Sequence, residues 1–267
     1  MIIGTERGHM MSPAGKFVAV VLMVLALVVE TSGRFANAAT VQELLEQADR
    51  LANDDDRFPD SLERAIVLYE QAGVVDPQNP LPYLRIASAC LELGNGLEDG
   101  RLPWYERGVW AAERAVVLKE DNADAHFYLA ANRGRLVEHV PFWKVSPTVP
   151  ADLEQHVLRA LTLDPHHARA LNMMGMLLNA VPGPLRLFME GKKEQVEDYL
   201  KRAVEADPHY AQLRWDLAEF YRAAGRQALA REQAQEILTL SNPTDRRAWA
   251  KKFRPQAETL LKTLSSP

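Results

Sequence analysis

Cysteine is nearly absent from this chain of 267 residues: Cys90 stands alone, so no disulfide can form within the molecule. The sequence also lacks a glycine-rich phosphate loop, a His-Glu-x-x-His metal motif and a nucleophile elbow. No pair of carboxylates has a spacing that singles it out for acid–base catalysis. We therefore expect a protein that is not an enzyme and that holds neither a cofactor nor a metal.

Long hydrophobic runs are missing too. The one long apolar stretch, residues 17–29 (FVAVVLMVLALVV), has thirteen residues, whereas a transmembrane helix needs about 20. Lys16 precedes the run, and residues 36–38 (Ala-Asn-Ala) follow it with the small residues that signal peptidase requires. The sequence thus predicts a signal peptide over residues 1–38 and an exported, periplasmic protein with no membrane span after cleavage. An uncleaved anchor is the alternative, and the candidate start residues are Met1, Met10 and Met11.

Basic residues do not dominate the composition. The chain has 31 Lys and Arg against 36 Asp and Glu, a net charge of −5, which becomes −6 once residues 1–38 are removed. This balance argues against nucleic acid and against an anionic membrane surface as a partner. No strand-like alternation and no low-complexity tract stands out.

What the chain does contain is a repeat. Residues 153–175 (LEQHVLRALTLDPHHARALNMMG) have a near-copy in residues 196–218 (VEDYLKRAVEADPHYAQLRWDLA), and each copy predicts a helix, an Asp-Pro turn and a second helix. Small residues let two crossing helices approach closely. Proline suits the first turn of the following helix, and aspartate before it can accept unpaired N–H groups there. Alanine recurs at one position of four successive repeats, at intervals of 43, 45 and 43 residues. We call these residues the alanine column: Ala72, Ala115, Ala160 and Ala203.

These columns resemble the tetratricopeptide repeat (TPR) family over residues 40–264. The resemblance implies an all-α fold: a helical-hairpin solenoid of about five TPR-like repeats in one domain, residues 39–267. The expected repeats are residues 40–76, 77–119, 120–164, 165–207 and 208–242, followed by a C-terminal capping helix at 245–264. The alternative is one irregular helical bundle.

The period is longer than the family's usual unit of about 34 residues. The extra residues fall between the paired helices and form long intra-repeat inserts at residues 94–103, 135–150 and 181–192. The expected helices are residues 40–51 and 61–74, 79–94 and 105–118, 122–136 and 152–163, 168–179 and 193–206, 211–224 and 227–240, and 246–264. The last of these carries Lys and Arg on one side, which favours a polar end cap over a binding patch.

A narrower resemblance rests on residues 125–130 (AHFYLA) and 181–191 (VPGPLRLFMEG). Both segments resemble the exported T component that accompanies some TRAP-type transporters. That resemblance implies an accessory of a solute transport system, with another exported protein, such as a solute receptor, as its partner. The chain departs from the lipoproteins of that group because no cysteine follows the predicted signal.

Several residues that could carry chemistry are explained by ordinary structural roles. Cys90 lies in an apolar helix, so we expect a core thiol rather than a reactive one. His166 and His209 occupy equivalent turns, which they would cap, and the histidines do not converge as a zinc site requires. Asp152 and Glu154 open a helix and suit its dipole.

The first helix of each pair is expected to line the concave side of the solenoid, which such proteins use for binding. On the family register the groove changes from apolar to polar along its length. Its positions are Leu81, Leu84, Ser88, Leu91, Asp124, Phe127, Ala131, Gly134, Arg169, Asn172, Met176, Asn179, Gln212, Trp215, Glu219 and Arg222. An uncovered apolar row would not persist in a soluble monomer. Either the inserts cover it, or a ligand, a partner or a second subunit does.

Aromatic residues stand beside prolines in the inserts, as in Phe142 and Trp143 after Pro141. They serve either as loop anchors or as a binding wall, in which case Arg135 and Lys144 would hold a carboxylate. The candidate binding residues are Leu84, Phe127, Arg135, Phe142, Trp143, Asn172, Met176, Trp215 and Arg222. The leading hypothesis is an exported protein-binding adaptor. The alternative is a carrier for a small apolar or organic-acid ligand in the covered groove, and a homo-oligomer is left open.

Overall fold

The computed structural model describes residues 39–141 and 144–265. The predicted signal peptide and the pair Phe142 and Trp143 lie outside the described residues. Within the described ranges every regular element is helical, and no helix there is long and apolar enough to cross a membrane. Residues Val41–Pro267 form one compact unit. The expectation of an all-α fold is confirmed.

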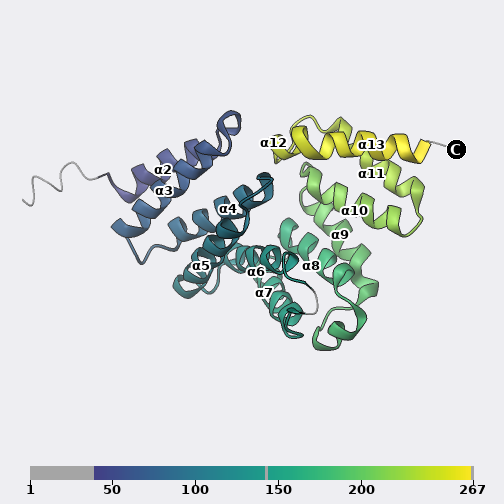
Figure 1. Ribbon diagram of the computed structural model, residues 1–267, viewed down its shortest axis with the longest axis horizontal. Coiled ribbons are helices and arrows are strands. Elements are labelled where there is room, and N and C mark those ends of the chain that lie inside the picture. Colours follow the sequence, from purple (N-terminus) through teal and green to yellow (C-terminus); the bar gives the residue numbers. More distant parts are fainter. Residues whose placement is uncertain (1–38, 142–143, 266–267) are drawn as a thin grey trace, which may run out of the picture. The chain divides into compact units, whose positions relative to one another are not determined.

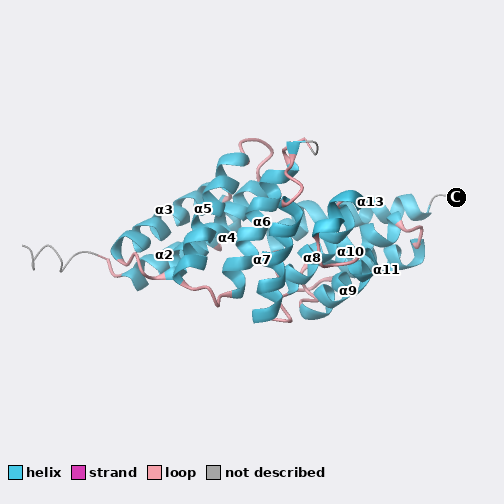
Figure 2. Cartoon of the chain, turned by 90° about the horizontal axis from the view of Figure 1, so that it is seen from below, coloured by secondary structure: helices cyan, strands magenta, loops and turns pink. Residues whose placement is uncertain are grey.

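Successive helices pair into hairpins that follow one another along the unit (Figures 1 and 2). The pairs are α2 (Val41–Ala52) with α3 (Asp60–Val75), α4 (Pro80–Gly96) with α5 (Leu102–Leu118), α6 (Ala123–Glu138) with α7 (Val149–Leu163), α8 (Ala168–Ala180) with α9 (Val196–Ala206), and α10 (Ala211–Ala223) with α11 (Gln227–Thr239). The chain closes with α12 (Arg246–Ala248), the π-helical η5 (Trp249–Phe253) and α13 (Arg254–Ser265). Short 3₁₀ helices are η1 (Asp55–Arg57), η3 (Gly183–Phe188) and η4 (Lys193–Gln195).

The alanine column lies at one depth in all four repeats. Each of these alanines is at most 1% exposed, and each carbonyl accepts the N–H of the residue that ends its helix: Ala72 from Asp76, Ala115 from Lys119, Ala160 from Asp164 and Ala203 from Asp207. A side chain of one carbon at these crossings lets adjacent helices pack closely. At an equivalent contact Gly175 is so close to α9 that a Cβ there would meet Leu200 Cδ2 at 2.8 Å.

The Asp-Pro turns differ from expectation in one respect. Each proline lies in the turn rather than in the following helix, because α4 and α8 begin three residues after Pro77 and Pro165. The carboxylate accepts the N–H of the residue two positions on, as Asp164 does from His166 at 3.0 Å. The helix cap comes later: His167 Nδ1 accepts the Ala170 N–H at 3.2 Å. The sequence predicted that His166 caps this turn. That prediction is wrong, because the side chain that accepts an N–H group in the turn is Asp164, and the histidine that caps the following helix is His167.

Cys90 is fully buried in the main core, and burial raises the pKa of its thiol to about 12. This confirms the core thiol. The interpretation of Glu154 as a residue that complements the helix dipole is wrong. Its carboxylate is 2% exposed and accepts the N–H groups of Glu190 and Gly191 at 2.8 and 2.6 Å. It thereby fixes the end of the third insert against α7. Asp152 instead forms an ion pair with Arg133 at 2.9 Å.

Candidate functional site

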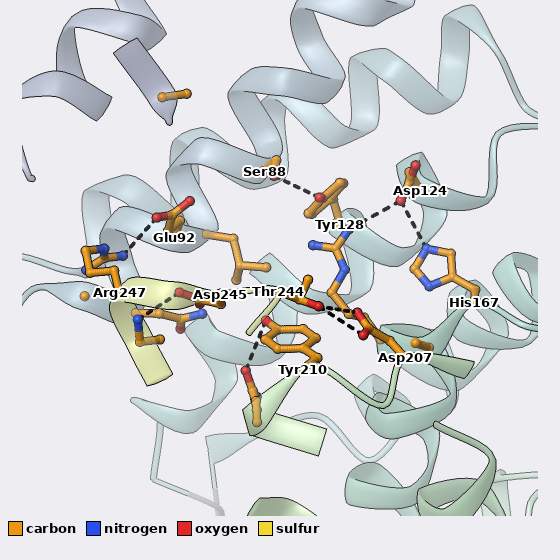
Figure 3. A pocket seen from close by; sticks show the side chains of 18 of the residues that line it. Ser88, Glu92, Asp124, Tyr128, His167, Asp207, Tyr210, Thr244, Asp245 and Arg247 are labelled. Atoms are coloured by element: carbon orange, nitrogen blue, oxygen red, sulfur yellow. Dashed lines mark hydrogen bonds and ion pairs between the residues drawn. The ribbon is translucent and has the colours of Figure 1, made fainter. Parts of the chain in front are cut away.

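A pocket of about 1320 Å³ follows the first helices of the pairs. Its walls come from α4, α6, α8 and α10, from the turns that precede these helices, and from the segment 244–253 near the C-terminus. Figure 3 shows side chains of α4, of α6, of the turns before α8 and α10 and of the segment 244–253 around the same space. The expectation that the first helices line a groove describes this arrangement, and we call the pocket the groove.

Arg169, the second residue of α8, lies over two aromatic rings of α6. Its guanidinium carbon is 4.9 Å from the ring centroids of both Phe127 and Tyr128, and it forms an ion pair with Asp124 at 3.5 Å. Ser88 of α4 donates to the Tyr128 hydroxyl at 2.8 Å. Cation–π and charge-assisted contacts of this kind hold a side chain in one position. The centre of the groove is therefore a preformed surface built from three consecutive repeats.

Asp124 and His167 form a second link between α6 and α8 (Figure 3). His167 Nδ1 accepts the Ala170 N–H, so the neutral ring carries its proton on Nε2, which donates to Asp124 at 3.1 Å. This hydrogen bond lowers the pKa of Asp124, although partial burial opposes the shift. Asp124 therefore carries a full negative charge at neutral pH, and it holds both His167 and Arg169.

The segment 244–253 crosses from the last pair of helices back to the first. Thr244 donates to Asp207 at 3.0 Å, and Arg247 pairs with Glu92 of α4 at 2.9 Å (Figure 3). The Arg247 guanidinium also lies 3.6 Å from the ring centroid of Phe58, with Asp55 at 3.8 Å, and its side chain is only 9% exposed. The far end of the solenoid thus closes one side of the groove.

Charges differ between the parts of the groove wall. The turns contribute carboxylates, including Asp164 and Asp207, whereas the opposite ends of the helices and the closing segment contribute both cations (Arg135, Lys251 and Lys252) and carboxylates (Glu92, Glu98 and Asp245). Burial lowers the pKa of Lys252, and the nearby positive charge of Arg135 lowers it further. An anionic group would relieve this repulsion between cations. Among the described residues no group of three or more His, Cys, Asp or Glu side chains could hold a metal ion.

The predicted site residues are scattered relative to this groove, and only Arg135 among them lines it. Phe127 is 5% exposed and lies beneath Arg169 and the His167 ring, so the next helix covers it rather than an insert. Leu84 is half-buried against the core. Asn172 is 6% exposed and donates to Asp216 at 2.7 Å.

The other predicted residues lie elsewhere. Met176 is exposed on α8, Trp215 packs α10 against the C-terminal core cluster, and Arg222 forms an exposed pair with Glu219 at 2.8 Å. Phe142 and Trp143 are outside the described residues. Nothing tests whether these side chains bind a partner, and they stay predictions.

The residues that sequence reasoning missed are Tyr128, Tyr210 and Arg247. Tyr128 is the residue after Phe127, and one residue along a helix changes which side chain faces the groove. Tyr210 is the N-cap residue of α10, equivalent to His167 in the preceding repeat, and that equivalence was a usable signal. Burial raises the pKa of the Tyr210 phenol, which keeps it a neutral hydrogen-bonding group.

Three comparisons place the chain among known proteins. The family model "Regulator of microtubule dynamics protein 1-3" matches residues 44–181. The crystal structure of TTC0263, a TPR protein from Thermus thermophilus, superposes with a TM-score of 0.63 at 18% identity, covering 84% of this chain and 100% of that one. A pilF structure from Pseudomonas aeruginosa has a TM-score of 0.49 at 14% identity, covering 82% and 89%. No curated protein sequence matches significantly. The first of these structures shows that the fold is a TPR-like solenoid.

Proposed function

The chain belongs to the family of Regulator of microtubule dynamics proteins 1-3, and from that premise we propose that it is a binding protein that holds an extended segment of a partner protein in the groove. The observation that carries this proposal is the preformed polar centre of a pocket of about 1320 Å³. Ser88, Tyr128 and Arg169 place hydrogen-bonding groups there on three consecutive first helices. No catalytic step is required of any of them.

The spacing of the helices suits an extended polypeptide. Packed helices lie roughly 8–10 Å apart, and an extended chain advances about 3.3 Å per residue. A bound strand running across the first helices would therefore meet the next helix about every third residue. Its carbonyl and N–H groups would find donors and acceptors already oriented by Asp124 and by the Ser88–Tyr128 hydrogen bond.

The lining favours this ligand over a small apolar molecule. Among the described residues that line the groove, Leu91 and Phe253 are the only large hydrocarbon side chains. A small-molecule site is normally apolar with a few polar groups, and this wall has the opposite balance. A carrier of an organic acid is the second candidate, because Arg135, Lys251 and Lys252 line the groove and are residue types that pair with carboxylates.

Peptides selected from a random library on the native protein test the proposal. Arg169→Ala removes a side chain that joins three groups at the groove centre, so we expect it to raise the Kd of a selected peptide at least tenfold. Arg202→Ala, outside the groove on α9 and exposed beside Asp198, is the matched control and should leave the Kd unchanged. Peptides that bind both variants equally would contradict the proposal. Native mass spectrometry that shows a retained small acid would favour the carrier.

Three finer expectations belong to this proposal and have their own tests. Export predicts that the mature protein begins at residue 39, which N-terminal sequencing of the exported fraction checks. The accessory role implied by the T-component resemblance predicts recovery of one stoichiometric solute receptor from that fraction. The family's description names microtubule dynamics, and co-sedimentation with microtubules tests whether this chain binds them.

A further inference from the structure

The two ends of the row of hairpins meet at one side chain. Arg247 of the closing segment pairs with Glu92 of α4 at 2.9 Å, and its guanidinium lies 3.6 Å from the ring centroid of Phe58. In the described part of the chain, every hydrogen bond and ion pair between residues 44–118 and residues 207–260 involves Arg247. We call Arg247, Glu92 and Phe58 the latch.

The closing segment (residues 244–253) is itself fixed to the last helices. Trp249 Nε1 donates to the Ile237 carbonyl of α11 at 2.8 Å. The Phe253 side chain is 3% exposed in the core cluster that α10, α11 and α13 share. Arg247 therefore moves with the C-terminal end of the row, and the latch is a contact between the two ends.

Between these ends, each pair of helices packs on the next. The main contacts of each helix are with its own partner and with the neighbouring pair, and a row of this kind bends by the sum of small rotations between neighbours. In Figure 1 the row curves so that α12 comes near α4, where the latch joins them. The groove follows the first helices between the two ends, so its width depends on whether the latch is closed.

Glycine at the end of α4 makes room for the latch. A Cβ on Gly96 would meet Phe58 Cζ at 2.5 Å and Arg247 Nη1 at 2.9 Å. Any side chain at this position would therefore displace the ring or the guanidinium. Three separate parts of the chain fit together here, and a change at Gly96 can disturb the latch without removing a charge.

The energetics of the ion pair suit a contact that opens and closes. Burial raises the pKa of the Glu92 carboxyl, although the pair with Arg247 lowers it. Loss of water therefore destabilises the ionised carboxylate more than the arginine stabilises it. Opening would hydrate both charges again, which offsets much of the attraction that is lost. The free energies of the closed and open states are thus close, as a reversible contact requires.

We propose that the latch opens and closes and thereby controls access to the groove. Opening lets the row bend outward and admits or releases the partner's extended segment, and closing holds the groove walls against that segment. This inference rests on the proposed function. In the closed state Lys251 and Lys252 line the groove together with residues of α4 and α6. A required opening step slows association, and the closed wall slows dissociation.

The rates of binding of a library-selected peptide test this inference by stopped-flow fluorescence. Arg247→Ala should release the peptide about tenfold faster than the native protein and should also bind it faster, because both steps pass through the open state. The Kd should change less than the dissociation rate does. Arg202→Ala, exposed on α9, is the control and should keep both native rates. Circular dichroism checks that the variants are folded.

Two further variants separate the latch from a direct contact with the peptide. Gly96→Ala should also raise both rates, since it displaces the latch and leaves every charge in place. Glu92→Gln should raise both rates in the native background and add nothing to Arg247→Ala, because the two changes break one interaction. Additive effects would contradict the latch. Faster dissociation without faster association would show a rigid wall that only touches the peptide, and would overturn the proposal.

A measurement without peptide keeps the latch separate from the proposed function. Spin labels on Asp56→Cys and Thr259→Cys report the distance between the two ends, because both positions are exposed and Cys90 is buried. The distance distribution should widen with Arg247→Ala and stay native with Arg202→Ala. An unchanged distribution in Arg247→Ala overturns the latch. A peptide that Arg169→Ala binds with native Kd overturns the proposed function instead, and the spin-label distances then decide on the latch alone.

Discussion

Arg247 and Glu92 are 155 residues apart in the chain, and their side chains form an ion pair at 2.9 Å. Arg247 belongs to the closing segment, and Glu92 to the first helix of the second pair. The same guanidinium lies over Phe58, so one side chain from the last part of the chain joins two of the first elements. The groove therefore has a wall that depends on the whole row of hairpins.

Replacing Arg247 should open that wall. Arg247→Ala removes an ion pair and a cation–π contact from a site where the arginine is 9% exposed, so we expect a loss of about 1–3 kcal/mol in the free energy of unfolding. The segment 244–253 should also become more accessible, which limited trypsin digestion after Lys251 and Lys252 measures. Arg222→Ala is the control. Equal digestion of native protein and Arg247→Ala would show that the pair does not hold the segment.

We expect the stability of the fold to require the carboxylate of Glu154, so that even glutamine, its amide, destabilises the protein. In Glu154→Gln one of the two acceptor oxygens becomes an NH₂ group, which faces a backbone N–H of Glu190 or Gly191. We expect a loss of about 2 kcal/mol, because a buried donor is left without a partner. Urea denaturation measures it, and faster amide exchange at residues 190 and 191 locates it. Asp152→Asn, two residues earlier and in an exposed pair, should cost under about 1 kcal/mol. If Glu154→Gln had the same free energy of unfolding as the native protein, the anchoring role of Glu154 would be contradicted.

Acidic pH should destabilise the fold through a histidine pair. His126 Nε2 donates to the Glu120 carbonyl at 2.9 Å, so its Nδ1 accepts from His156 Nδ1 at 3.1 Å. Burial lowers the pKa of His156 below its ordinary 6.5. The unfolded chain therefore binds the proton first, and this contribution to stability is present above pH 6.5 and is lost as the pH falls from there through the folded pKa.

The pH prediction is checked by comparing unfolding free energies of native protein and His156→Gln between neutral pH and pH 5. The other titrating groups are common to both proteins, so the difference between the two profiles isolates His156. The native protein should lose more stability than the variant over this interval. Parallel profiles would refute the assignment.

We expect larger side chains in the alanine column to destabilise the protein. Ala160 is 0% exposed at a helix crossing, so Ala160→Leu should overpack it and destabilise the protein by about 1–3 kcal/mol. Thr162→Leu, two residues on and exposed, should change stability by under about 0.5 kcal/mol. Thermal denaturation compares the two. If Ala160→Leu were tolerated as well as Thr162→Leu, close helix contact would not be the reason for the small residue at this column.

The fold was predictable because the residues that determine each helical hairpin lie close together in the sequence and recur in successive repeats. Ala160 and Ala203 lie in near-identical segments, and the paired helices begin and end within a few residues of their expected bounds, whereas the expected last helix is divided by the π-helical η5. The groove residues were harder. Arg169 was placed correctly by the family register, but Tyr128 follows Phe127 directly, and which of two adjacent side chains faces outward depends on small rotations of each helix.

The contact between Arg247 and Glu92 could not have been predicted from the sequence. It depends on the rotation between successive hairpins summed over the whole row, and each rotation is set by packing rather than by any one residue. The anchor at Glu154 was missed for a different reason. A carboxylate near a helix start usually complements the dipole, and only the path of the third insert shows that this one accepts backbone N–H groups.

The central claim, that a partner binds along the first helices, is tested most directly by hydrogen–deuterium exchange of the native protein with and without a library-selected peptide. The account predicts slower exchange in α6, α8 and α10 around Tyr128, Arg169 and Tyr210, with α3 and α5 unchanged. Protection confined to α3 and α5, or protection that persists in Arg169→Ala, would contradict it.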